Sequence, residues 1–409
     1  MKKGFPIKPL QSFCDDFKQD IVDGPFGSEL KREDYLTEGI PVLKIQNVKP
    51  FTIELKKMDY VSSEKFHELK RHSFRLGDIV MTKLGNPLGV SAIVEDLEKG
   101  VIVADLVRVR AQQINTKYLC YHLNSQRTND FINSMQKGTT RPRVTLSVVR
   151  ELPIYAPPLA EQQRIVGLLD EAFENLATAK ANAEKNLQNS RALFESHLQS
   201  VFTQRGLGWK QTMLGEEIDL LAGFAFKSAQ YTAKEKDIRL LRGDNIIQGC
   251  LRWDDVKRWP ANDTKEYERY QLHEGDVVLA MDRPWVKAGL KHATIAADDL
   301  PCLLVQRTAR FRGGANLENR FLKLLIGSSA FTSHILGVQT GIGVPHISGQ
   351  QIKDFEFARP PLADQRRIAD NLESFREETQ RLARIYERKL AALTELKKSL
   401  LHQAFTGEL

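Results

Sequence analysis

Hydrophobic residues recur every three or four positions in two long stretches of the chain. The first stretch follows Pro157 and runs to Val201, and the second follows Pro360 and runs to Leu400. This spacing is that of an amphipathic helix with one apolar stripe, and it is close to the heptad spacing of a coiled coil. Neither stretch contains a proline beyond its opening turn. The pattern predicts two helices of about 43 residues, each ~65 Å long at 1.5 Å per residue.

The two stretches are copies of one another. PPLAEQQRI at Pro157 corresponds to PPLADQRRI at Pro360, and the register of 203 residues holds without a gap as far as Thr203 and Thr406. A proline pair and an acidic residue suit a helix N-terminus. Each helix needs a partner for its apolar stripe, and the obvious partner is the other copy. Because the second helix must then run back along the first, we expect an antiparallel coiled coil.

The segments that precede the two helices also repeat, but less closely. GDIVMT at 77–82 matches GDVVLA at 275–280 with an offset of 198, whereas GTTRPRVTL at 138–146 matches GIGVPHISG at 341–349 with an offset of 203. Short runs rich in β-branched residues indicate strands. The predicted fold class is α+β, with two mixed α/β domains separated by a pair of long antiparallel coiled-coil helices. The expected boundaries, in the order domain, helix, domain, helix, are 1–156, 157–206, 207–359 and 360–409.

Two candidate surface loops stand out in each predicted domain. One follows the strand that begins with Gly-Asp, and the other precedes the return to the long helix. Their flanks agree between the two copies whereas the loops differ, which lets one scaffold present two specificities. Arg, Lys, Asn and Gln side chains read base edges, while Thr and backbone N–H groups contact phosphates. The candidate DNA-contacting residues are Lys83, Asn86, Lys137, Thr139, Thr140, Arg141, Arg143, Arg283, Lys287, Thr340 and His346.

Each of these residues also has a structural alternative, because Gly, Pro and charged side chains are what ordinary turns contain. Lys44, Gln46 and Asn47 form a further group, which could face DNA or form the polar side of a strand. Trp285 lies beside the loop residues, and we expect it to be packed rather than stacked on a base.

Composition narrows the class of protein. Hydrophobic residues make up 42% and charged residues 27% of the 409 positions, as in soluble proteins of two or three domains. There is no run of 18 apolar residues and no apolar segment after the N-terminal lysines, so we expect a cytoplasmic protein without membrane contact. Four scattered cysteines fit a reducing compartment and no structural zinc. The net charge of +7, with a pI near 9.0, is compatible with a nucleic-acid partner.

Motifs that would make the chain an enzyme are missing from the sequence. There is no D/N-P-P-Y/F turn of an adenine methyltransferase and no G-x-x-x-x-G-K-S/T phosphate loop. Gly341-Ile342-Gly343 lacks the strand before it and the helix after it that a dinucleotide loop requires. The charged surroundings of His67 and His72 indicate solvated side chains rather than metal ligands. We therefore expect no catalytic residue and no metal site in this chain.

The duplicated PPLA helices, the two alternating domains, the Gly-Asp strands and the loops together resemble the specificity subunit of type I restriction–modification systems. The resemblance covers essentially the whole chain. It implies that each domain recognises one half of a bipartite double-stranded DNA target. It also implies that the helices set the gap between the half-sites and dock two methyltransferase subunits. Because the loops differ between the domains, we expect an asymmetric target.

The resemblance places the chemistry on other subunits. Methyltransferase subunits would use S-adenosylmethionine to methylate adenine at N6, and motor-nuclease subunits would use ATP and Mg to translocate and cut unmethylated DNA in defence against phage. This chain would bind none of these cofactors. Two alternatives remain on the residues alone: a DNA-modifying protein with an unrecognised motif, and a structural coiled-coil adaptor for other proteins.

Overall fold

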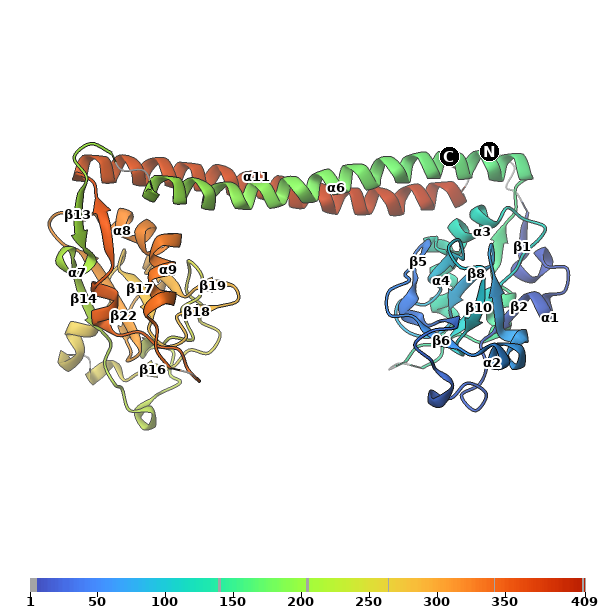
Figure 1. The fold of residues 1–409 in the computed structure, drawn as a ribbon, viewed down its shortest axis with the longest axis horizontal. Coiled ribbons are helices and arrows are strands. Elements are labelled where there is room, and N and C mark those ends of the chain that lie inside the picture. The colour runs from blue at the N-terminus through green and yellow to red at the C-terminus, as the bar shows by residue number, and fades with distance from the viewer. Residues whose placement is uncertain are drawn as a thin grey trace. The chain divides into compact units, whose positions relative to one another are not determined.

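The fold is known from a computed structural model, which describes residues 6–138, 141–203, 206–263, 265–341, 343–406 and 408. The chain forms two compact units (Figure 1). Unit 1 contains residues 1–184 and 387–409, and unit 2 contains residues 185–386. Both long helices, α6 (Leu159–Thr203) and α11 (Leu362–Thr406), contribute one part to each unit. Each unit therefore combines a mixed α/β globular part with two helical segments.

Unit 1 is built around two four-stranded sheets. One sheet has the order β2 (Ile21–Asp23), β11 (Leu106–Val109), β8 (Ile79–Thr82), β9 (Ser91–Ile93). The other has the order β6 (Asp59–Val61), β3 (Ile40–Leu43), β10 (Lys99–Ile102), β7 (Ser73–Arg75). Two small sheets pair β1 (Ile7–Pro9) with β12 (Pro153–Tyr155) and β4 (Val48–Lys49) with β5 (Thr52–Ile53). The α-helices are α1 (Phe17–Asp20), α2 (Ser63–Glu68), α3 (Thr116–Leu123), α4 (Gln126–Met135) and α5 (Leu146–Arg150).

Unit 2 repeats the central sheet in the same order. That sheet contains β14 (Ile218–Ala222), β22 (Thr308–Gly313), β17 (Val277–Ala280) and β20 (His292–Thr294). A three-stranded sheet contains β16 (Arg258–Trp259), β15 (Ile238–Leu241) and β21 (Cys302–Leu304), and small pairs join β13 (Lys210–Met213) to β23 (Glu356–Arg359) and β18 (Trp285–Val286) to β19 (Gly289–Leu290). The α-helices are α7 (Leu214–Glu217), α8 (Asn319–Ile326), α9 (Ser329–Val338) and α10 (Gly349–Lys353). The predicted fold class is confirmed.

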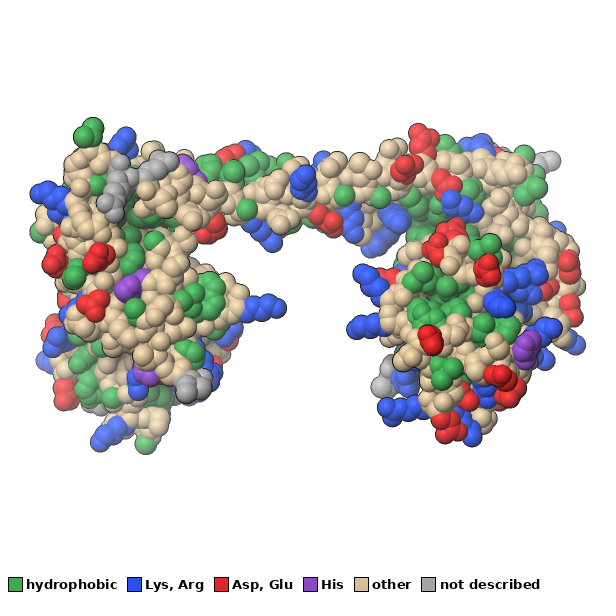
Figure 2. All heavy atoms as spheres, viewed as in Figure 1, with side chains coloured by type: hydrophobic (Ala, Val, Ile, Leu, Met, Phe, Trp, Pro, Cys, Tyr) green, Lys and Arg blue, Asp and Glu red, His purple; other side chains and the backbone are tan. Residues whose placement is uncertain are grey.

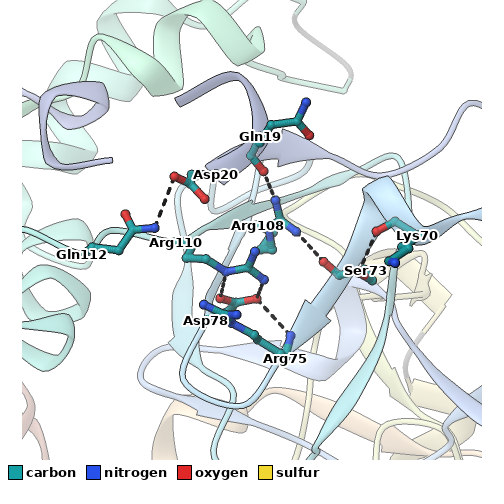
Figure 3. A network of polar contacts seen from close by, with 9 residues as sticks. All are labelled: Gln19, Asp20, Lys70, Ser73, Arg75, Asp78, Arg108, Arg110 and Gln112. Atoms are coloured by element: carbon teal, nitrogen blue, oxygen red, sulfur yellow. Dashed lines mark hydrogen bonds and ion pairs between the residues drawn. The ribbon is translucent and has the colours of Figure 1, made fainter. Parts of the chain in front are cut away.

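In the repeated Gly-Asp motif, the aspartate is buried and hydrogen-bonded, as the close-up of unit 1 shows (Figure 3). Asp78 is 2% exposed, and its two carboxylate oxygens accept hydrogen bonds of 2.8 Å from Nε and Nη2 of Arg110. The same carboxylate accepts the backbone N–H of Arg75 at 2.9 Å. A buried carboxylate is tolerated when it is paired and hydrogen-bonded in this way. Gly77 takes a φ of +87°, which favours glycine in the turn before the strand.

Unit 2 contains the same arrangement at equivalent positions. The carboxylate of Asp276 accepts from Arg312 at 2.5 and 2.8 Å and from the backbone N–H of His273 at 2.8 Å. Each pair joins the start of one central strand, β8 or β17, to the end of the neighbouring β11 or β22. The strand that leads into the first candidate loop is thereby fixed in both units.

For Asn47 and Lys44, the structure decides between the two alternatives. Asn47 is 1% exposed, and its amide accepts the backbone N–H of Lys44 at 3.0 Å and donates to the carbonyl of Glu54 at 2.9 Å. Asn245 makes the equivalent hydrogen bonds to Arg242 and Arg252 in unit 2. The side chain of Lys44 forms an ion pair with Asp59. Asn47 and Lys44 therefore serve the fold.

The two long helices run antiparallel within each unit. In unit 1, Phe173 of α6 packs in the same cluster as Leu400 and Leu401 of α11. In unit 2, Leu198 of α6 packs with Leu372 of α11. Residues late in one helix therefore meet residues early in the other. Burial of these apolar side chains stabilises the pairing.

Each globular part is attached to the beginning of one long helix and to the end of the other. In unit 1, Tyr118 of α3 contacts Phe405 near the end of α11, with ring centroids 5.4 Å apart. In unit 2, Phe321 of α8 contacts Phe202 near the end of α6, also at 5.4 Å. These four residues are two pairs separated by 203 positions. The sequence repeat is therefore also a repeat of tertiary contacts.

The beginnings of the long helices are held by equivalent polar contacts. Gln162 of α6 donates to the carbonyl of Pro157 at 2.8 Å and accepts the N–H of Asn115 at 2.9 Å. Gln365 of α11 makes the same pair of contacts with Pro360 and Glu318. This accounts for the glutamine in both copies of the PPLA motif.

No single helix in the described part of the chain is long and apolar enough to cross a membrane. Helices α8 and α9, which are bent relative to one another, reach the required length and apolar content only when they are taken together. Most of their apolar residues are buried in the core of unit 2.

We predict that Phe405→Ala destabilises unit 1 by about 3–5 kcal/mol, because a 1% exposed aromatic ring leaves a cavity. All four tryptophans lie within residues 185–386, so their fluorescence reports unit 2 alone. On denaturation, the variant should show a lower midpoint for the unit 1 transition seen by circular dichroism. The fluorescence midpoint, which reports unit 2, should stay unchanged. Leu396→Ala, at a 47% exposed position of α11, is the control. Equal effects of the two variants would contradict the packing described.

Candidate functional site

The candidate loops lie side by side in each globular part. We call residues 83–87 and 137–143 loop pair 1, and residues 282–285 and 339–346 loop pair 2. In loop pair 1, the first loop directly follows strand β8 and the second follows helix α4. In loop pair 2, the first loop begins two residues after the end of strand β17, and the second follows helix α9. The sequence predicted the loops separately, and the structure shows that each pair forms one continuous tip.

Backbone hydrogen bonds join the two loops of loop pair 1. The N–H of Gly85 donates to the carbonyl of Pro142 at 3.0 Å, and the N–H of Val144 donates to that of Lys83 at 3.0 Å. Within the second loop, Lys137 and Arg143 exchange N–H to carbonyl hydrogen bonds at 2.9 and 3.0 Å. These contacts pair Lys137 with Arg143 and join the second loop to the first.

Loop pair 2 has the same backbone connections. The N–H of Arg283 donates to the carbonyl of Pro345 at 2.6 Å, and Thr340 and His346 exchange hydrogen bonds at 2.9 and 2.8 Å. The isolated β-bridges also correspond: Leu84 pairs with Arg143 in unit 1, and Asp282 pairs with His346 in unit 2. The backbone of the tip is therefore conserved between the two units while its side chains differ.

Most of the predicted residues present their side chains to solvent. The exposed members are Asn86, Lys137, Arg141, Arg143, Arg283, Lys287 and Thr340. Thr139 and Thr140 lie outside the described residues. Figure 2 shows Lys and Arg side chains distributed over both globular parts and interspersed with acidic ones. The face shown in Figure 2 therefore has no uniform basic surface.

Three predicted residues, Lys83, Thr340 and His346, have side-chain partners within the protein. The Lys83 ammonium lies 2.5 Å from a carboxylate oxygen of Asp23. His346 is half-buried, with Nε2 3.1 Å from the hydroxyl of Thr340 and Nδ1 3.3 Å from the carbonyl of Val344. All three lie at the loop pairs, and their side chains also help to hold the loops in shape.

Two cations that the sequence analysis missed, Arg307 and Lys291, lie next to the first loop of loop pair 2. The backbone carbonyl of Arg307 accepts the N–H of Met281, and its exposed guanidinium lies 3.6 Å from Asp282. The backbone N–H of Lys291 donates to Pro284 at 2.7 Å, and burial lowers the pKa of its ammonium. Arg307 occupies the place of Asp105 in unit 1, where the carbonyl accepts from Lys83. Aligning the residues that directly precede β11 and β22 would have shown this reversal of charge.

The hairpin β18–β19 carries an exposed aromatic residue. Trp285 is 41% exposed, and Lys287 lies exposed in the turn that follows. The expectation that Trp285 is packed is therefore wrong. Because the strands of the hairpin are two residues long and pair only with each other, the tip offers no core in which the indole could be buried.

The chemistry of both loop pairs suits recognition of nucleic acid. Exposed guanidinium, ammonium, amide and hydroxyl groups at a rigid backbone tip can contact phosphates and base edges. Within the described residues, no group of three His, Cys, Asp or Glu side chains could hold a metal. Burial raises the pKa of Cys14, Cys120 and Cys302 to about 12, so these thiols remain protonated and unreactive at neutral pH.

The chain is similar to known proteins of one family. A family model described as the type I restriction modification DNA specificity domain matches residues 57–188 and 207–387, which is more than half of the chain. The EcoAI specificity subunit of Escherichia coli is 40% identical over 167 residues, covering 41% of this chain but only 28% of that protein. The MjaVIII specificity subunit of Methanocaldococcus jannaschii is 26% identical over 327 residues, covering 76% of this chain and 75% of that protein.

Solved structures share the fold. A chain from work on complex assembly and conformational transition of the type I R-M system has a TM-score of 0.75 at 19% identity and covers 100% of this chain and 99% of its own. The HsdS subunit from Thermoanaerobacter tengcongensis has a TM-score of 0.66 at 19% identity, with 100% and 98% covered. The chain therefore belongs to the specificity subunits of type I restriction–modification systems, the non-catalytic class that recognises DNA sequence for its partner subunits.

Proposed function

We propose that each loop pair recognises one half of a bipartite, asymmetric double-stranded DNA target. The observation that carries this proposal is the repeated backbone of the two tips. Equivalent hydrogen bonds at Gly85 and Arg283 hold different side chains in the same geometry. A scaffold that keeps the frame and changes the contacting groups is suited to two different half-sites.

The side chains divide into two roles. In loop pair 1, Lys137, Arg141 and Arg143 supply positive charge at one tip, where they can neutralise phosphates or donate to guanine. At loop pair 2, Arg283 and the neighbouring Arg307 have the same capacity. Phosphate contacts position the protein, whereas base contacts give specificity, and the mixture of Arg with Asn and Thr provides for both.

We propose that the long helices dock two methyltransferase subunits. Leu193 of α6 is 49% exposed, and Leu396 of α11, its equivalent 203 residues later, is 47% exposed. The helix starts repeat this feature, since Leu159 and Leu362 are also exposed. Exposed leucines at equivalent positions of a duplicated helix provide two similar apolar contacts. Two copies of one partner can use them in the same way.

Catalysis and cofactors belong to the partners in this proposal. The methyltransferase subunits bring S-adenosylmethionine, and motor-nuclease subunits bring ATP and Mg. The contribution of this chain is to hold those subunits on a chosen sequence. The paired helices, each of 45 residues, set the number of base pairs between the half-sites.

Removal of the basic side chains should affect one half-site at a time. We expect Arg141→Ala with Arg143→Ala to relax recognition in one half-site only, and Arg283→Ala to relax the other. Each lost base contact should weaken discrimination by about 1–3 kcal/mol. Methylation-sensitive sequencing of DNA from cells carrying the assembled system gives both half-sites. Lys18→Ala, at an exposed position of α1, is the control. Relaxation of both half-sites by one variant would contradict the assignment.

Charge placed on the equivalent leucines should remove the methyltransferase subunits one by one. We expect Leu193→Asp or Leu396→Asp to leave one bound copy and the double variant to leave none, because a carboxylate in an apolar contact is costly to desolvate. Mass photometry of the reconstituted complex measures the stoichiometry. Gln188→Asp adds the same charge at an exposed position of α6 and should leave two copies. Full assembly of the double variant would refute this docking surface.

Shorter helices should shorten the spacer. Deleting residues 181–187 and 384–390 together removes seven residues from each helix, which preserves the heptad phase and shortens it by ~10 Å. The sequenced target should lose up to about three base pairs of spacer at 3.4 Å each, with unchanged half-sites. Duplicating the same segments should lengthen the spacer. A changed half-site with the original spacer would argue against this role of the helices.

A further inference from the structure

The hairpin β18–β19 distinguishes the tip of unit 2 from that of unit 1. The central sheets have equivalent strand orders, in which β8 corresponds to β17 and β9 to β20. Residues 83–90 connect β8 to β9 and form no hairpin, whereas residues 281–291 connect β17 to β20 and contain β18 and β19. The connection in unit 2 is three residues longer. The hairpin is therefore an addition to the shared scaffold at loop pair 2.

The base of the hairpin is fixed to the body of unit 2. Leu290 is 5% exposed and packs in the core of this unit. The backbone N–H of Lys291 donates to the carbonyl of Pro284 at 2.7 Å, and the side-chain amide of Gln248 donates to the carbonyl of Gly289 at 3.3 Å. Gly289 takes a φ of +126°, which favours glycine. These contacts hold the short hairpin in one orientation on the globular part.

The free end of the hairpin presents apolar side chains to solvent. Trp285 pairs with Leu290 and Val286 pairs with Gly289, so successive side chains lie on opposite faces of the hairpin. Trp285 is 41% and Val286 is 37% exposed, and the turn at residues 287–288 is exposed as well. Figure 2 shows hydrophobic side chains gathered where Figure 1 labels β18 and β19. Both faces of the hairpin are therefore open to solvent.

The second loop of loop pair 2 extends this apolar surface. Val344 is 44% exposed, and it stands 203 positions after Arg141, an exposed cation of loop pair 1. The hydrogen bond from the N–H of Arg283 to the carbonyl of Pro345 brings Val344 and the hairpin to the same tip. The tip of unit 2 is therefore more apolar than that of unit 1, where Arg141 and Arg143 are exposed.

Positive charge borders the apolar surface. Arg283 precedes the hairpin and Lys287 lies in its turn, and in the described part of the chain neither side chain forms an ion pair. Asp282 is the acidic residue of loop pair 2, and its carboxylate lies 3.6 Å from the guanidinium of Arg307. Apolar side chains between free cations suit a polyanion that also presents apolar groups. Double-stranded DNA is such a partner, because thymine methyl groups lie in its major groove between two rows of phosphates.

We propose that the hairpin β18–β19 enters the major groove of the half-site recognised by unit 2, where Trp285 and Val286 contact thymine methyl groups. The backbones of two paired strands lie about 4.8 Å apart. With its side chains such a ribbon fits the major groove, which is about 12 Å wide, and not the minor groove, which is about 6 Å wide. Lys287 in the turn then neutralises a phosphate. This proposal rests on the function proposed for loop pair 2.

The test removes the methyl group from the DNA and its contact from the protein. Fluorescence anisotropy measures binding of the complex, reconstituted with methyltransferase subunits, to a duplex with the sequenced target. Each thymine is replaced in turn by deoxyuridine, which lacks the methyl group. We expect a replacement in one half-site to weaken binding about fourfold, the effect of exposing one buried methyl group. Trp285→Ala or Val286→Ala should weaken binding to the thymine duplex and make that same replacement silent.

Met213→Ala is the matched control, because Met213 is a 43% exposed apolar residue of β13 in the same unit. This variant should keep the fourfold effect of the replacement. Additive losses from the replacement and from both hairpin variants overturn the proposal, since residues in contact are coupled. Equal binding of the thymine and deoxyuridine duplexes by the unaltered complex also overturns it.

Two further outcomes separate this proposal from others. If Trp285→Ala prevents assembly with the methyltransferase subunits, the hairpin is a protein contact and the proposal is wrong. If the unaltered complex binds the target and an unrelated duplex equally, the function proposed for the loop pairs fails, and this proposal fails with it. Sequence-specific binding that ignores every thymine methyl group overturns the role of the hairpin alone.

Discussion

A 45-residue helix with an apolar stripe is not stable alone in water, and this constraint organises the rest of the molecule. The stripe must be covered, and the duplicated helix covers it in antiparallel register in both units. The ends of the helices then become parts of the globular cores, as Phe202 and Phe405 do. The same contacts at both places explain why the helical register of 203 residues has no gap. A shift of one residue would rotate every apolar side chain by about 100° away from its partner.

Hydrophobic periodicity and internal repeats in the sequence predicted most of the fold. The helices, the strands after Gly-Asp and the two loops of each domain could all be predicted, because each depends on local pattern. Contacts between distant residues could not be predicted in the same way. The pairing of Lys83 with Asp23 and the burial of Asn47 depend on where the chain folds back. Arg307 was missed because its importance comes from an equivalent position in space, not from a motif.

The two units differ most where the scaffold is least constrained. The carboxylate–arginine pairs of Asp78 and Asp276, and the glutamines of the helix starts, are kept because each satisfies buried polar groups that the fold cannot leave unpaired. At the loop tips, the side chains diverge while the backbone hydrogen bonds are the same. Duplication has thus separated the residues that maintain the structure from those that are free to acquire different contacts.

The participation of Phe405 in the core of unit 1 has a consequence for synthesis. Unit 2 is one continuous segment, so all of its contacts are available once residue 386 has left the ribosome. Unit 1 joins residues 1–184 to residues 387–409, and its core lacks Leu401, Ala404 and Phe405 until more than 200 further residues have been translated. At usual rates this delay is on the order of tens of seconds. The domain that is made first is therefore the one that is completed last.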